Sequence, residues 1–137
     1  MTTLLLGCHA FFALVAITVS ILGVQARTPE RARTMGLWLF AAVGAQTVLG
    51  DFLYPFYLRS VKPVLGAMVA GRRSAAEIFE VKEHLAFFAL VLATAAFAVT
   101  RSEPRPTPFV RVLFGGAHAA IVLVATLGLV VASLRTP

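Results

Sequence analysis

Four long apolar runs constrain the fold of this chain more than any other feature of its sequence. They cover residues 4–24, 35–53, 85–99 and 112–134. A bilayer core about 30 Å thick is crossed by about 20 helical residues, which is close to the length of three of these runs. The third run is shorter, but Ile78, Phe79 and Val81 extend it. Strict alternation of apolar and polar residues is absent, so the runs predict helices rather than barrel strands.

The composition points to lipid as the solvent of this protein. Hydrophobic residues make up 59% of the sequence and charged residues only 13%, whereas a soluble domain carries about 25% charged residues. We therefore predict an all-α integral membrane protein, with residues 1–137 forming one up-down-up-down four-helix bundle. The net charge of +6 does not indicate nucleic-acid binding, because the arginines fall in short connections where they reach lipid headgroups.

The connections divide between two membrane faces. Residues 25–34 and 100–111 lie on one face, side A, whereas residues 58–74 and both termini lie on the other, side B. Within the connection 58–74, the apolar residues 64–70 are too few to span and are expected to lie at the interface. No charged residue precedes the first run and three arginines follow it, which favours a cytoplasmic side A. We expect a bacterial inner-membrane protein with both termini outside.

Several ionisable residues lie inside or next to the predicted spans. Placing an ionisable group in the membrane costs free energy, so such residues are functional candidates. With a helical rise of about 1.5 Å per residue, His9 lies about 7 Å from the middle of the first helix, towards side B. Asp51 comes near the end of the second helix, and Glu80 and His84 lie in the first turns of the third. The sequence therefore places these four side chains at a similar level near side B.

The helical faces of the two histidines follow from the spacing of their neighbours. In the first helix, small residues continue from His9 at spacings of three and four: Ala13, Ala16, Ser20 and Gly23. Small residues mark packing faces in membrane bundles. In the third helix a comparable stripe contains Glu77, Glu80, His84, Val91, Ala95 and Ala98. Both histidines are therefore predicted to point into the bundle, from helices that lie diagonally.

Two histidines at one level on diagonal helices can ligate a haem iron from opposite sides. Four basic residues near side B could hold the propionates: Arg59, Lys62, Arg72 and Arg73. In this arrangement the chain resembles the small four-helix b-type membrane cytochromes. The resemblance implies one haem b and electron exchange with a quinone or a redox protein. The chain departs from the two-haem members because its second helix has no histidine, and because His118 lies towards side A with only Gln46 near mid-span.

Two other interpretations remain open. The side chains of His9, Asp51, Glu80 and His84 are a mixed ligand set that suits zinc or iron. Alternatively, the chain is a cofactor-free accessory subunit that docks on a larger membrane complex, or a homo-oligomer. Whichever function holds, a purely structural role is an alternative for His9, which could bond to Asp51 or Glu80, and His118 is expected to bond to a neighbouring helix. The sequence shows no nucleophile–base pair or phosphate loop, so it assigns no enzyme reaction.

Overall fold

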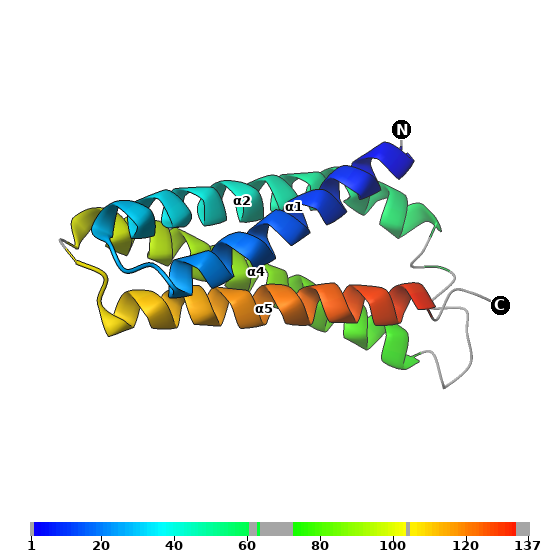
Figure 1. Cartoon of the computed structure of the whole chain (residues 1–137). Coiled ribbons are helices and arrows are strands. Elements are labelled where there is room, and N and C mark those ends of the chain that lie inside the picture. Colours follow the sequence, from blue (N-terminus) through cyan, green and yellow to red (C-terminus); the bar gives the residue numbers. More distant parts are fainter. Residues whose placement is uncertain (1, 61–62, 64–72, 104, 134–137) are drawn as a thin grey trace.

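The protein is described by a computed structural model that covers residues 2–60, 63, 73–103 and 105–133; the side chains of residues 2, 73–76, 78 and 131–133 are not described. Four long helices make up the fold: α1 (Thr2–Val24), α2 (Pro29–Ser60), α4 (Arg73–Ser102) and α5 (Pro108–Ser133). They form one bundle in which the start of α1 and the end of α5 lie at the same end (Figure 1). The predicted all-α four-helix fold is confirmed. The proposed interfacial segment 64–70 lies outside the described residues.

Each of the four helices is long and apolar enough to cross a membrane. The candidate spans are Thr3–Val24, Pro29–Ser60, Phe79–Ser102 and Pro108–Val130, with mean hydropathies of 2.3, 1.4, 1.8 and 2.1. On side A, α2 and α5 both begin with proline directly after a threonine cap. The N–H of Arg31 donates to Thr28 Oγ1 at 3.3 Å, and the N–H of Val110 donates to Thr107 Oγ1 at 3.3 Å. These caps end the short side-A connections and start the next span.

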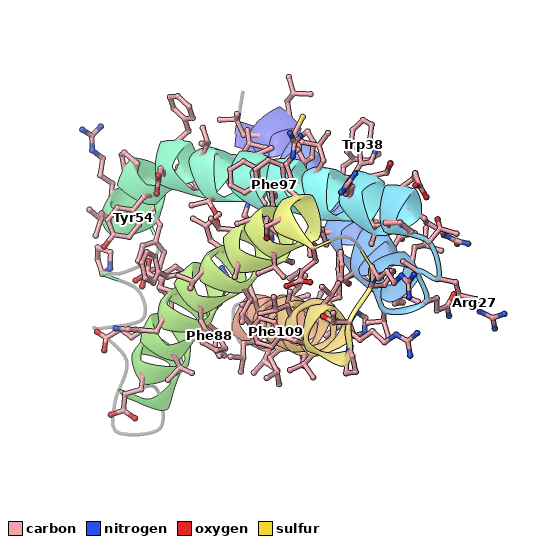
Figure 2. All side chains as sticks on the ribbon, turned by 90° about the vertical axis from the view of Figure 1, so that its left-hand side faces the viewer. Arg27, Trp38, Tyr54, Phe88, Phe97 and Phe109 are labelled. Carbon is pink, nitrogen blue, oxygen red and sulfur yellow. The ribbon has the colours of Figure 1, made fainter. Side chains whose placement is uncertain are left out.

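The helices pack in a ring. α1 contacts α2 and α5, and α4 contacts the same two helices, so α1 and α4 lie diagonally as predicted. Viewed along the bundle, the labelled Trp38 and Arg27 point away from the helices (Figure 2). Small residues fill the interior; the buried alanines of the core are Ala16, Ala42, Ala89, Ala93, Ala96, Ala117 and Ala120. Many large apolar side chains, by contrast, lie on the outside, which is the arrangement expected for helices that associate in lipid.

The closest approach of α1 and α5 occurs at Gly23. A Cβ atom at this position would overlap the ring of Phe114, a side chain that is fully buried. On the opposite corner, a Cβ at Gly36 of α2 would lie 2.6 Å from Thr100 Oγ1 of α4. Both glycines therefore permit contacts between neighbouring helices near side A, because a larger side chain would force those helices apart.

Replacing Gly23 by alanine should destabilise the bundle. The new methyl group meets a ring with no space to move into, and overpacking of this kind costs about 1–3 kcal/mol. Gly7→Ala is the matched control, because it makes the same change in the same helix with nothing within 4 Å of the new Cβ. Thermal unfolding in detergent should show a lower midpoint for Gly23→Ala and an unchanged or higher one for Gly7→Ala. Equal midpoints for the two variants would contradict the packing described here.

Candidate functional site

His9 points into the bundle and is bound to the main chain of α2. Its Nδ1 lies 3.1 Å from the carbonyl oxygen of Gln46. A Cβ at Gly50, one turn further along α2, would lie 3.7 Å from His9 Cε1, so this glycine leaves room for the ring. The inward direction and the level predicted for His9 agree with these contacts. The partner is a main-chain carbonyl, however, and not the carboxylate of Asp51 or Glu80.

The face of α4 that meets the bundle is not the one predicted. Its buried residues are Ala89, Ala93, Ala96 and Thr100, and at helical spacing Lys82 continues this row towards side B. The predicted stripe is largely exposed, including Glu77, Glu80, His84, Val91 and Ala98. Two residues span roughly 200° around a helix, so Lys82 and His84 lie on nearly opposite faces. The prediction that His84 points inward is therefore wrong.

His84 lies on the outside of α4, and its Nδ1 is 2.8 Å from the carbonyl oxygen of Glu80 in the same helix. Asp51 is exposed on α2. Arg59 is exposed near the end of α2, whereas Lys62, Arg72 and the side chain of Arg73 lie outside the described residues. Of the predicted site residues that are described, only His9 faces the interior of the bundle.

The interior at side B instead holds Lys82, which was not among the predicted site residues. Its Nζ lies 4.9 Å from the centre of the Phe79 ring, close enough for a cation–π interaction. Its Cε lies 3.6 Å from the position of a Cβ at Gly128 of α5. Lys82 and Phe79 of α4 thus meet Gly128 of α5 at the end of the bundle where His9 of α1 contacts α2. We call Lys82, Phe79 and His9 the side-B cluster.

The aromatic part of this cluster joins α4 to α2. The rings of Phe79 and Tyr57 stack with centroids 3.8 Å apart and an interplanar angle of 6°. Lys82 is half-buried beside this stack, with its aliphatic chain against the helices and its ammonium near the membrane edge. The spacing of Lys82 from Ala89, Ala93 and Ala96 was the signal in the sequence that could have identified it.

These positions do not fit a haem held between His9 and His84 inside one chain. The iron would need a nitrogen from each side, but His84 is on the face of α4 that points away from His9. The four-residue metal site has no support either. Among the described residues, no three His, Cys, Asp or Glu side chains gather closely enough to hold a metal ion. The reason is again orientation, because Asp51, Glu80 and His84 are exposed on the outside of two helices.

His118 forms a second polar contact, nearer side A. Its Nδ1 lies 2.9 Å from Ser20 Oγ of α1. The Ser20 hydroxyl donates to the carbonyl oxygen of Ile17 at 2.7 Å, so it accepts from His118, whose proton is then on Nδ1. This bond confirms the prediction that His118 is bonded to a neighbouring helix. It ties α1 to α5 through two side chains, which is a structural role.

Comparisons with protein-family models, curated proteins and solved structures find no match for this chain. The resemblance to b-type cytochromes thus rests on helix number and histidine level alone. Within the described residues, the side-B cluster brings ionisable side chains to the bundle interior, whereas Glu80 and His84 are exposed on the outside of α4.

Removing the Ser20 hydroxyl should leave His118 without its acceptor. An unpaired buried donor costs about 1–3 kcal/mol, so Ser20→Ala should lower the thermal midpoint in detergent. Thr18→Ala is the control, since Thr18 is exposed and its hydroxyl bonds only to Leu14 of its own helix. Adding His118→Phe to Ser20→Ala removes the unpaired group and should restore part of the loss. A midpoint for Ser20→Ala as high as that of Thr18→Ala would argue against the bond.

Proposed function

We propose that this chain is a non-catalytic subunit of a larger membrane complex and that it docks through the outer face of α4. This face comprises Glu77, Glu80, His84 and Val91, all of them exposed. The observation that carries the proposal is the presence of Glu80 and His84 on the side of a membrane-spanning helix that points away from its own bundle. In lipid, such side chains are costly unless another protein segment covers them.

The depth of these residues supports a covered position. The candidate span of α4 runs from Phe79 to Ser102, so His84 lies about 10 Å from its middle, inside a hydrocarbon half-thickness of about 15 Å. Glu80 lies one turn nearer the membrane edge. Glu80, about 16 Å from the middle, therefore lies at the boundary with the headgroups. Lipid tails offer His84 no hydrogen bond, whereas a neighbouring helix can.

The charge of the surface indicates the kind of partner. Among the described residues, four carboxylates and one arginine are exposed on the outside of α2 and α4 at this end: Asp51, Glu77, Glu80, Glu83 and Arg59. A second copy would bring like charges together if it presented the same face. A partner helix with an arginine or lysine at the same depth would complement the carboxylates and their neighbour His84. We place this partner in the outer half of a bacterial inner membrane, with both termini of the chain outside.

Haem-linked electron transfer is the second candidate, and one feature favours it. The Nδ1 atoms of His9 and His84 each lie beside a main-chain carbonyl, a contact that metal-ligating histidines commonly make while leaving Nε2 free. Because His84 faces outwards, it would ligate a haem shared with a partner chain. A haem, when bound, would supply the electron-transfer chemistry with quinone or a redox protein. His84 would orient it, and the outer face of α4 would line one side.

A photo-crosslinking residue at Phe87 tests the docking face in living cells. Phe87 is 68% exposed and lies on the outer side of α4, whereas the control, Phe11, is 60% exposed on the diagonal helix α1. Substitution at Phe87 should give one discrete protein adduct, and substitution at Phe11 only lipid adducts. The Phe87 adduct should weaken at least several-fold in Glu80→Gln/His84→Leu, because the polar contacts that hold the partner are lost.

Two outcomes would reject the proposal. Lipid adducts alone at Phe87 would mean that the face meets the bilayer. An adduct of twice the mass of the 14.6 kDa chain would identify a second copy instead of a different partner. The absorption spectrum of the purified cross-linked complex addresses the second candidate: a Soret band lost in His84→Leu would support it, and a colourless complex would reject it.

A further inference from the structure

A pocket on side A lies at the opposite end of the bundle from the proposed docking face. Its volume is about 660 Å³, and it opens between the end of α1, the connection to α2 and the first turn of α5. Its lining residues are Val24, Gln25, Arg27, Thr28, Arg31 and Arg111. Two separate segments of the chain, residues 24–31 and the first turn of α5, thus bring three arginines to one pocket, and no acidic residue is among the lining residues.

The three arginines are not engaged in holding the fold together. Within the described part of the chain, the guanidinium groups of Arg27, Arg31 and Arg111 make no hydrogen bond, ion pair or ring contact, and all three residues are exposed. Two other arginines on the same membrane face differ. Arg33 donates from Nε to the carbonyl oxygen of Thr100 at 3.1 Å, and Arg101 lies 4.7 Å over the Phe97 ring. The pocket therefore gathers three of the side-A arginines whose charges remain available to a ligand; a fourth, Arg105, is exposed outside it.

The helices add to the positive potential of the pocket. α2 and α5 both begin at this end of the bundle, at Pro29 and Pro108. The first turn of a helix carries a partial positive charge from its unpaired N–H groups. Arg31 and Arg111 lie in those first turns, so their charges and the two helix starts act in the same direction, and only Glu30 in the first turn of α2 opposes them. Figure 2 shows the end of the bundle where α1 is connected to α2, with Arg27 extending from the connection.

The depth of the pocket in the membrane indicates the class of ligand. Val24 is the last residue of its span, and Arg111 is the fourth residue of the span that starts at Pro108. The pocket therefore lies where the hydrocarbon gives way to headgroups. Guanidinium groups bind phosphate oxygens with paired hydrogen bonds. A headgroup with net negative charge suits three uncompensated arginines, whereas a zwitterionic headgroup would bring an ammonium towards them.

We propose that the pocket formed by Arg27, Arg31 and Arg111 binds the phosphate of an anionic phospholipid headgroup. Free inorganic phosphate has the same recognition chemistry, so the test has an arm for each source. The purified chain in detergent is titrated with dioleoylphosphatidylglycerol, with dioleoylphosphatidylcholine or with inorganic phosphate, and bound ligand is measured by native mass spectrometry.

Phosphatidylglycerol should bind at least tenfold more tightly than phosphatidylcholine. Each of Arg27→Gln, Arg31→Gln and Arg111→Gln should weaken its binding about fivefold, the value of one basic contact at a membrane surface. Arg111→Lys should recover part of the loss, because it restores the charge without the paired hydrogen bonds. The matched control is Arg101→Gln, which removes the same charge from the same membrane face outside the pocket and should leave binding unchanged.

Equal affinity for the two lipids would overturn the proposal. So would a loss in Arg101→Gln as large as in the pocket variants, since binding would then follow net charge and not the pocket. Inorganic phosphate that binds as tightly as phosphatidylglycerol, with the same dependence on the three arginines, would replace the lipid by a soluble phosphate as the ligand. These outcomes do not depend on any partner at the outer face of α4, so either proposal can fail alone.

Discussion

In a bilayer, an apolar side chain gains little by leaving lipid for the interior of a protein, so helices associate mainly by close packing. That constraint explains why the interior of this bundle consists mostly of alanine, with glycine and serine where helices approach most closely. Gly23 against Phe114 and Gly36 against Thr100 fix two of the four corners near side A. The positions of the ionisable side chains follow from the face that each helix turns towards these contacts.

The orientation of α4 has the largest consequence for function. This helix contacts both of its neighbours: Phe97 stacks on Phe40 of α2, and Leu92 lies beside Gly116 of α5. These contacts turn Ala93 and Ala96 to the interior. A helix is rigid over this length, so the same rotation brings Lys82 inside and His84 outside. The ionisable residues that the sequence places at one level near side B are thereby divided between the interior and the outer surface.

The two ends of the bundle handle charge differently. On side A, arginines lie in or beside the short connections at the headgroup level. Some of them contact the end of α4, and others surround an open pocket. On side B, carboxylates and a histidine lie on the outside of α2 and α4, and a half-buried lysine lies beside two stacked aromatic rings. The basic pocket would suit anionic lipid and the carboxylates would suit a basic protein partner, which are the two contacts proposed for this chain.

Much of this could be read from the sequence, because the relevant physics is local. Length and hydropathy determine the four spans, and the small residues that follow His9 determine its inward face. The direction of α4 could not be determined in this way, since two stripes in that helix carry small residues, one with Ala95 and Ala98 and one with Ala89, Ala93 and Ala96. Only contacts with α2 and α5 select between them. The bond between Ser20 and His118, 98 residues apart in the chain, likewise exists only because the tertiary structure brings α1 and α5 together.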